Sequence, residues 1–199
     1  MTYRIGIIGC GGMGRSHAQH WQQRDDTTVV AAMDISAEAV GRLASECEVP
    51  ATYTDYDEML ASETLDIVSI PTWQGARAAP TIAAAAAGVK AILGEKPIAD
   101  NLGNADDMIA ACNEHGVKLA IGHQRRFSPQ ANEIRRLVAA GAIGEPRIVS
   151  HIAKPNAGLL NTATHAIDGW RYYLGDPETL WVIGQASRTT DRRERRQSL

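Results

Sequence analysis

The sequence has few cysteines. Its 199 residues contain 3 cysteines, Cys10, Cys47 and Cys112, which are widely spaced and form no C-x-x-C pair. This usage argues against a disulfide framework and a cysteine-based zinc site. We expect small buried apolar side chains at these positions, no metal site, and a reducing compartment, the cytoplasm.

The sequence also lacks a long apolar run and a strong charge imbalance. No stretch approaches the roughly 18–20 apolar residues of a membrane-spanning helix. The N-terminus, MTYRIGIIGCGG, lacks the basic and long apolar regions of a secretory signal. The formal net charge of -3 gives no reason to expect nucleic acid as a partner. The 44% hydrophobic content is enough for a buried core and excludes disorder as the dominant state.

Apolar runs and amphipathic stretches alternate through the first 122 residues. This alternation predicts an α/β fold, a doubly wound parallel Rossmann sheet over residues 1–122. We expect strands at 3–9, 29–35, 51–53, 65–70, 91–93 and 118–122, and helices at 14–24, 37–46, 56–61, 76–87 and 104–115.

The rhythm changes after Gly122. We expect helices at 129–140 and 163–174 and strands at 147–153 and 180–186, which would form a partial α/β substrate domain over residues 123–187. Residues 188–199 carry five arginines against one aspartate and one glutamate. The simplest interpretation is a solvated, disordered tail, with anion or nucleic-acid binding as the alternative.

A glycine-rich turn separates the first expected strand from the first helix. The pattern G-x-G-x-x-G suits a tight turn, lets backbone N–H groups approach a pyrophosphate, and places the phosphate at a helix N-terminus. It predicts dinucleotide binding by Gly9, Gly11, Gly12, Met13 and Gly14.

Asp34 ends the second expected strand, twenty residues past Gly14. A carboxylate there can accept both ribose hydroxyls of NAD and would repel a 2′-phosphate, so NAD is favoured over NADP. Ile35 follows and would lie beside the cofactor. The alternative role for Asp34 is helix capping near Ser36.

The tripeptide Glu95-Lys96-Pro97 follows the fifth expected strand, at the edge where an open parallel sheet binds ligands. A lysine there can hold a substrate hydroxyl and stabilise a developing alkoxide. A neighbouring carboxylate can orient that lysine. The alternative is a surface Glu-Lys pair before a proline turn.

Together these segments resemble the Gfo/Idh/MocA oxidoreductases. The resemblance extends to His123-Gln124-Arg125-Arg126-Phe127 and to the segment from Gly158 to Asp168, and it runs from Tyr3 to about Ala186. It implies an NAD(P)-dependent dehydrogenase that acts on a sugar, a polyol or a related hydroxy compound. A homo-oligomer is implied for a full-length form.

The resemblance also assigns roles to particular residues. Lys96 matches the family's active-site lysine, and His165 matches its general acid/base. An imidazole suits proton transfer near neutrality, although a histidine early in a helix can equally cap or pack. The remaining expected cofactor contacts are Pro71, Thr72, Trp73, Glu95, Lys96, Gln124 and Arg125.

Three features depart from the family pattern. Asn161 stands four residues before His165, where the family commonly has aspartate; it can hydrogen-bond a substrate hydroxyl but supplies no negative charge. Gly75 or Arg77 replaces a histidine that often follows the proline-threonine turn. The expected second domain is short, which favours a fragment over a natural short form.

These observations predict an NAD-dependent oxidoreductase. The alternative is a non-catalytic NAD(H)-binding module or an inactive truncated member. An NAD-dependent glycoside hydrolase is a third candidate within the same resemblance.

Overall fold

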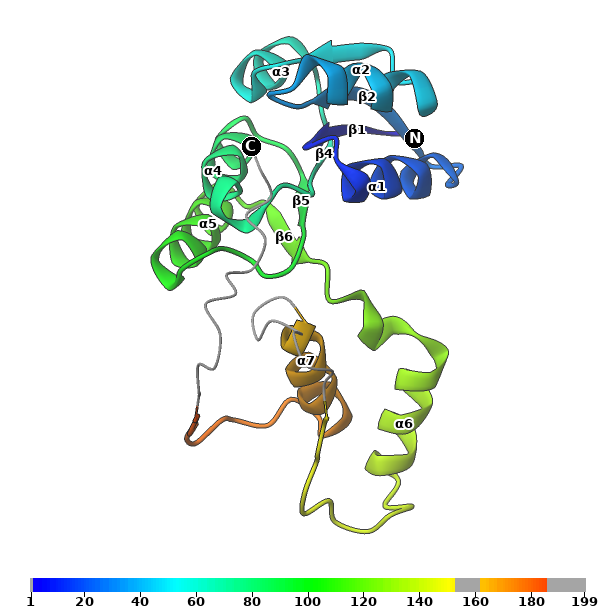
Figure 1. Cartoon of the computed structure of the whole chain (residues 1–199), viewed down its shortest axis with the longest axis vertical. Coiled ribbons are helices and arrows are strands. Elements are labelled where there is room, and N and C mark those ends of the chain that lie inside the picture. Colours follow the sequence, from blue (N-terminus) through cyan, green and yellow to red (C-terminus); the bar gives the residue numbers. More distant parts are fainter. Residues whose placement is uncertain (1, 153–161, 186–199) are drawn as a thin grey trace, which may run out of the picture. The chain divides into compact units, whose positions relative to one another are not determined.

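The structure, a computed structural model, describes residues 2–152 and 162–185. The chain divides into two compact units, residues 1–122 and 123–199 (Figure 1). We call them unit 1 and unit 2. Asn161 and the basic segment 188–199 lie outside the described residues.

Unit 1 contains a six-stranded sheet in the order β3-β2-β1-β4-β5-β6, in which every neighbouring pair is parallel. The chain moves outward from β1 to β3, returns to the centre, and moves outward again from β4 to β6. The strands are β1 Tyr3–Ile8, β2 Thr27–Met33, β3 Ala51–Tyr53, β4 Ile67–Ile70, β5 Ala91–Gly94 and β6 Lys118–Ile121. This topology confirms the predicted doubly wound Rossmann sheet.

Five α-helices and one short 3-10 helix connect these strands. They are α1 Gly12–Gln22, α2 Ala37–Glu46, α3 Tyr56–Ser62, η1 Gln74–Ala76, α4 Ala78–Ala86 and α5 Leu102–Glu114. Local chemistry explains where α2 begins and where α4 ends. The Ser36 side chain accepts from the N–H of Ala39 at the start of α2, and Gly88, at φ 80°, follows α4 in the left-handed region that favours glycine.

The core of unit 1 lies on both faces of the sheet. Successive strand residues point to opposite faces, so Ile7 packs with Val40 and Leu43 of α2, whereas Ile8 packs with Met59 of α3. As the sequence predicted, all three cysteines are free thiols buried in this core.

Unit 2, in its described part, is helical. It contains the 3-10 helix η2 Gln124–Phe127 and the helices α6 Pro129–Ala139 and α7 Thr164–Tyr173. The strands expected at 147–153 and 180–186 were wrong over their described residues, 147–152 and 180–185, which form no strand.

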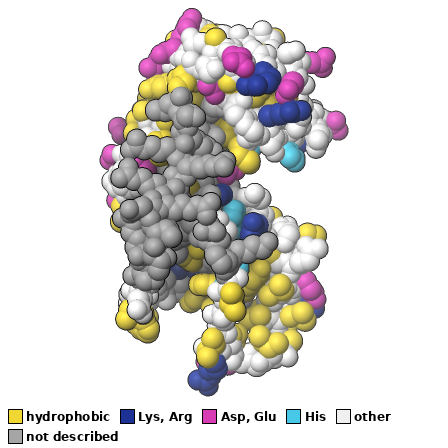
Figure 2. Space-filling model, viewed as in Figure 1, with side chains coloured by type: hydrophobic (Ala, Val, Ile, Leu, Met, Phe, Trp, Pro, Cys, Tyr) yellow, Lys and Arg dark blue, Asp and Glu magenta, His cyan; other side chains and the backbone are white. Residues whose placement is uncertain are grey.

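The failed strands have a common physical cause. A β-branched run becomes a strand when a neighbouring strand pairs with its backbone, and no described residue of unit 2 provides one. Their side chains instead face solvent: Ile152 is 94% exposed and Trp181 76%. Figure 2 shows hydrophobic side chains at the surface of unit 2. In the described parts of both units, no helix is long and apolar enough to cross a membrane.

Candidate functional site

Five segments of unit 1 lie at one edge of the sheet, because each follows the carboxyl end of a parallel strand. They are the glycine turn 9–14 after β1, Asp34 after β2, the turn 71–73 after β4, the tripeptide 95–97 after β5, and Gly122 after β6. Ligands of open α/β sheets bind at this edge, where the strand order reverses between β1 and β4.

The glycine turn needs its glycines for two different reasons. Gly9 has φ 103°, and a Cβ there would lie 2.9 Å from Cγ2 of Thr72. A Cβ at Gly14 would lie 1.9 Å from the carbonyl oxygen of Gly9, so α1 packs directly on the turn. Gly11 and Gly12 instead have open space where a Cβ would stand, with nothing within 4 Å.

This open space lies at the N-terminus of α1. The helix is capped by Gly11 without a side-chain hydrogen bond, and its first turn contains no acidic residue. Exposed backbone N–H groups and the helix dipole therefore point toward an uncrowded space that suits a pyrophosphate. These residues fit a dinucleotide cofactor.

Cys10 lies inside the turn as a buried thiol. Burial, together with the nearby charge of Asp34, raises the pKa of the Cys10 thiol to about 12. The protonated thiol donates to the carbonyl of Met33 at 3.3 Å.

The Asp34 carboxylate hydrogen-bonds to the same glycine turn. Its Oδ2 accepts from the backbone N–H of Cys10 at 2.7 Å, and its Oδ1 accepts from the N–H of Ser36 at 3.0 Å. Asp34 does not itself cap α2, because the N-cap is Ser36, but it accepts from the N–H of that cap residue. These contacts leave room for a cofactor role, because a carboxylate has further lone pairs and Asp34 is partly exposed. Ile35 beside it is 74% exposed.

The turn after β4 is partly buried at Pro71 and Thr72, while Trp73 is 58% exposed. The buried Oγ1 of Thr72 has no hydrogen-bond partner among the described residues. Because Thr72 adjoins Gly9, this turn and the glycine turn are neighbours.

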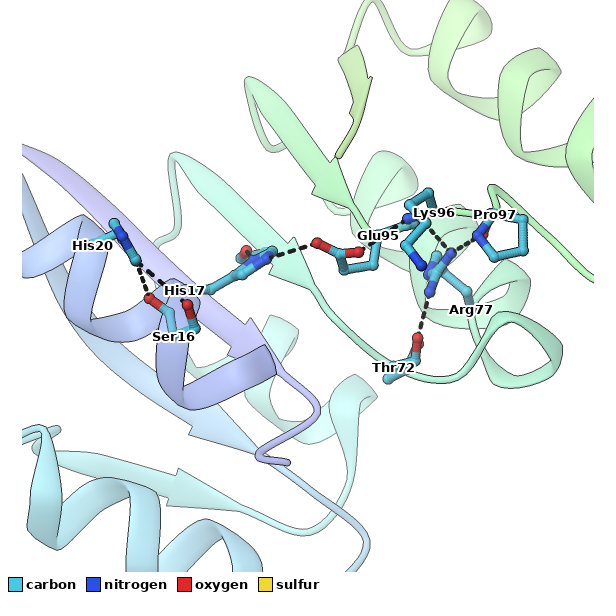
Figure 3. Close-up of polar contacts among 9 residues, drawn as sticks. Ser16, His17, His20, Thr72, Arg77, Glu95, Lys96 and Pro97 are labelled. Carbon is cyan, nitrogen blue, oxygen red and sulfur yellow. Dashed lines mark hydrogen bonds and ion pairs between the residues drawn. The ribbon is translucent and has the colours of Figure 1, made fainter. Parts of the chain in front are cut away.

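Glu95 is only 8% exposed and is not the surface residue of the alternative interpretation. Its Oε1 lies 3.3 Å from Nε2 of His17, and its Oε2 accepts from the backbone N–H of Lys96 at 3.2 Å (Figure 3). Burial alone would raise the pKa of Glu95. The hydrogen bond and charge of His17, with the backbone N–H of Lys96, outweigh it and hold the pKa below its usual value.

Arg77 joins two of the five segments. Its guanidinium is 1% exposed and donates to the carbonyls of Thr72, Glu95 and Pro97, and to that of Ile98 at 3.2 Å. Figure 3 shows this side chain between Thr72 and Pro97. Burial lowers the pKa of Arg77 to about 10, a fall that the negative charge of Glu95 opposes.

In unit 2, a second polar cluster surrounds the start of α7. The rings of His123 and His165 meet edge to face with their centroids 5.8 Å apart. Nδ1 of His123 lies 3.9 Å from Oδ2 of Asp168, and Arg126 donates to both oxygens of that carboxylate, with Nε at 3.1 Å. The hydrogen bond to Asp168 is the main cause that raises the pKa of Arg126 above its usual value.

The structure therefore groups the predicted site residues by unit. Gly9 to Gly14, Asp34, the turn 71–73 and Lys96 share one edge of unit 1, whereas Gln124, Arg125 and His165 belong to unit 2. Gln124 and Arg125 are exposed on η2. In the described residues, no group of three or more His, Cys, Asp or Glu could hold a metal ion.

Sequence reasoning missed two contributors, His17 and the buried role of Arg77. His17 stands three residues past Gly14 in the first helix, on the side that packs on the sheet. This spacing from the glycine turn is the sequence signal that could have identified His17 as part of the site. Arg77 was noted only as a departure from a family pattern, and no local pattern reports four carbonyl partners.

Comparison with known proteins shows which family the chain belongs to. A model described as the oxidoreductase family with an NAD-binding Rossmann fold matches residues 3–123, so this part of the chain is an NAD-binding Rossmann domain. Since the match covers more than half of the 199 residues, the chain belongs to this family, Gfo/Idh/MocA. The predicted family and the predicted cofactor are confirmed.

Several relatives act on polyols or sugars, as their names state. D-apiose dehydrogenase of Paraburkholderia graminis is 34% identical over 144 residues, which cover 72% of this chain and 38% of that protein. Myo-inositol 2-dehydrogenase of Thermotoga maritima is 29% identical over 185 residues, which cover 87% of this chain and 55% of that protein.

A solved structure supports the same fold. The crystal structure of myo-inositol dehydrogenase from Lactobacillus casei, in complex with NAD(H) and myo-inositol, matches with a TM-score of 0.76 and 26% identity, covering 88% of this chain and 55% of that one. The chain thus spans 38% to 55% of the lengths of these three proteins.

Proposed function

We propose that this protein is an NAD-dependent dehydrogenase that transfers a hydride between a carbinol carbon of a polyol or sugar and a nicotinamide. The observation that carries the proposal is the sheet edge of unit 1, where the open glycine turn, Asp34 and Lys96 follow parallel strands. Relatives named for D-apiose and myo-inositol support the substrate class.

In this proposal, unit 1 is the cofactor domain, and residues 123–187 form part of the substrate domain. Bound NAD supplies the hydride acceptor. The backbone N–H groups of the turn hold its pyrophosphate, and Asp34 and Ile35 hold a ribose. The other proposed cofactor contacts are Pro71, Thr72, Trp73, Glu95, Lys96, Gln124 and Arg125.

Three residues are proposed to touch the substrate. The ammonium of Lys96 holds the reacting hydroxyl oxygen and stabilises developing alkoxide charge. His165 removes the hydroxyl proton as general base. Asn161 hydrogen-bonds a substrate hydroxyl.

The test is NADH formation, followed at its own absorbance, with NAD⁺ and a panel of inositols, other polyols and aldoses. Lys96→Ala and His165→Ala should each lower kcat at least ~100-fold, within the range of a positioned acid or base. Both variants should still bind NAD⁺, and only Lys96→Ala, which loses one proposed cofactor contact, should raise the Kd. Equal turnover in wild type and both variants would contradict the catalytic assignments.

A second candidate function is a non-catalytic NAD(H)-binding module. Asn161 favours it, since this residue stands where the family commonly has aspartate. This candidate predicts NADH binding with no turnover on any member of the panel. Substrate-dependent NADH formation would reject it.

We also propose that a full-length form of the protein is a homo-oligomer in the cytoplasm. The exposed apolar side chains of unit 2, such as Trp181 and Val182 at 76% and 85%, support association, because such surface is normally covered by a partner. Light scattering of the purified protein measures the assembly directly, and a monomer at micromolar concentration would reject it.

A further inference from the structure

We propose that His17 is a positioning residue of the active site, whose imidazole ties helix α1 to Glu95 and so holds the backbone of Lys96 in place. The role of Lys96 rests on the proposed dehydrogenase function. The contacts of His17 rest on the geometry of unit 1 alone.

His17 joins three segments of the sheet edge. It projects from the second turn of α1, with Nδ1 2.7 Å from Oγ of Ser69 in β4 and Nε2 3.3 Å from Oε1 of Glu95 after β5. Glu95 in turn accepts from the backbone N–H of Lys96. Figure 3 shows the His17 side chain directed from α1 to the Glu95 carboxylate.

The contact is directional. An ionised Glu95 only accepts hydrogen bonds, so Nε2 of His17 is the donor. The other ring nitrogen, Nδ1, contacts the Ser69 hydroxyl, which can donate or accept and is fully buried at 0% exposure. A histidine with both partners satisfied has one orientation, and its side chain is only 11% exposed.

Glu95 has little freedom to relax if His17 is lost. The oxygen that meets His17, Oε1, also lies close to Gly122, where a Cβ would stand 2.9 Å from it. A buried carboxylate deprived of its donor must draw in water or shift. Either change withdraws the acceptor from the Lys96 N–H.

The expected effect is larger on catalysis than on cofactor affinity. The pyrophosphate contacts proposed for the turn are backbone N–H groups of residues 11–14, which precede His17 by at least three residues. A misplacement of about 1 Å at a reacting group can cost roughly 100-fold in rate.

Two substitutions separate the two contacts of the ring. The amide nitrogen of His17→Gln can occupy the position of Nε2 and still donate to Glu95. The shorter side chain of His17→Asn reaches only the position of Nδ1, beside Ser69. We expect kcat to fall about 10–100-fold in His17→Asn and to stay within about threefold of wild type in His17→Gln. The Kd for NAD⁺ should rise by a smaller factor than kcat falls in His17→Asn, since Glu95 and Lys96 are also proposed cofactor contacts, and should be nearly unchanged in His17→Gln.

The matched control is His20→Asn on the same helix. His20 is exposed, and its Nδ1 lies 2.6 Å from the backbone oxygen of Ser16, one turn earlier in the same helix. This variant should match wild type in kcat, KM and melting temperature.

A second measurement does not depend on turnover. Competitive acetylation with acetic anhydride, read by mass spectrometry, gives the reactivity of the Lys96 amine relative to Lys90, which pairs with Asp66 elsewhere in unit 1. We expect a several-fold change at Lys96 and none at Lys90 in His17→Asn, with His17→Gln like wild type. Gly122→Ala, whose added Cβ would crowd Oε1 of Glu95, should also alter the reactivity of Lys96 alone.

These outcomes separate the two proposals. Wild type without turnover on any substrate would contradict the dehydrogenase function, and the labelling would still decide the role of His17. Unchanged Lys96 reactivity in His17→Asn and Gly122→Ala would overturn the positioning role. An equal loss of kcat and of stability in His17→Asn and His17→Gln would also overturn it, by showing that the ring serves only the fold.

Discussion

At the residue scale, Asp34 links the fold to the proposed cofactor. Its carboxylate accepts from the N–H groups of Cys10 and Ser36 and is proposed to accept the ribose hydroxyls of NAD. A hydrogen bond to a charged group contributes about 1.5–3 kcal/mol. We therefore expect Asp34→Ala to raise the Kd for NAD⁺ about 10–100-fold, measured by titration calorimetry.

The same variant tests the preference for NAD. Without the carboxylate, the 2′-phosphate of NADP⁺ is no longer repelled, so the affinity ratio of NAD⁺ to NADP⁺ should fall. Asp26→Ala is the control, because this exposed carboxylate pairs with Arg24 away from the sheet edge. An unchanged ratio in Asp34→Ala would contradict the ribose contact.

Arg77 is the residue on which the loop geometry most depends. It donates to four carbonyls, and each carbonyl left buried without a donor costs about 1–3 kcal/mol. Arg77→Met should lower the free energy of unfolding by about 3 kcal/mol or more, measured by urea denaturation. Arg24→Met, at an exposed arginine, should change it by less than about 0.5 kcal/mol.

Glu95 predicts a dependence of stability on pH. Its pKa is lowered in the folded protein, so it contributes stability that is present above its unfolded pKa and is lost as pH falls through the folded value. Glu95→Gln should therefore be less stable than wild type at pH 7, and the difference should shrink below about pH 4.5. Denaturation from pH 3 to 7 measures it. Glu114→Gln, at an exposed glutamate, should show no such convergence.

At the scale of elements, the packing of α1 on the glycine turn gives a paired test. Gly14→Ala places a Cβ 1.9 Å from the carbonyl oxygen of Gly9, so the helix must move. We expect a loss of at least 2 kcal/mol, on the order of other overpacking changes, together with weaker NAD⁺ binding.

Gly41→Ala is the matched substitution in α2, where nothing lies within 4 Å of the added Cβ. Alanine favours a helix over glycine by about 0.5–1 kcal/mol, so this variant should melt higher than wild type. Thermal unfolding of both variants measures the contrast. Equal shifts would show that α1 tolerates displacement at the turn.

The elements of unit 1 were predictable because their signals are local. β-branched residues between glycines marked β1, and Ser36 marked the start of α2, where the structure begins that helix at Ala37. The first helix was predicted to start at residue 14, two residues after its actual start, because the glycines at positions 12 and 14 are not typical of a helix. The two expected strands of unit 2 failed because a strand depends on a neighbour that its own residues do not encode.

The candidate site was likewise predictable only where its signals are local. The cofactor turn and the tripeptide 95–97 were predictable, because strand ends in a parallel sheet share an edge. The contact between His17 and Glu95 joins residues 78 positions apart. No periodicity reports such a pair, and only the order of the strands brings it together.

At the scale of the whole molecule, the division into residues 1–122 and 123–199 gives the last prediction. The proposed phosphate and ribose contacts of the glycine turn and Asp34 belong to unit 1, so NAD⁺ should stabilise that unit directly. At a free concentration of 100 Kd, linkage gives about 2.7 kcal/mol, which corresponds to an upward shift of roughly 5–10 °C for a chain of this size.

Scanning calorimetry of the purified chain with NAD⁺ and with NADP⁺ measures this shift. The transition of unit 1 should rise with NAD⁺ and less with NADP⁺, because Asp34 repels the extra phosphate. A second, unshifted transition would belong to unit 2. A chain that unfolds cooperatively but shifts with neither nucleotide would contradict the cofactor proposal, because a fold that binds NAD must gain stability by mass action when NAD is present.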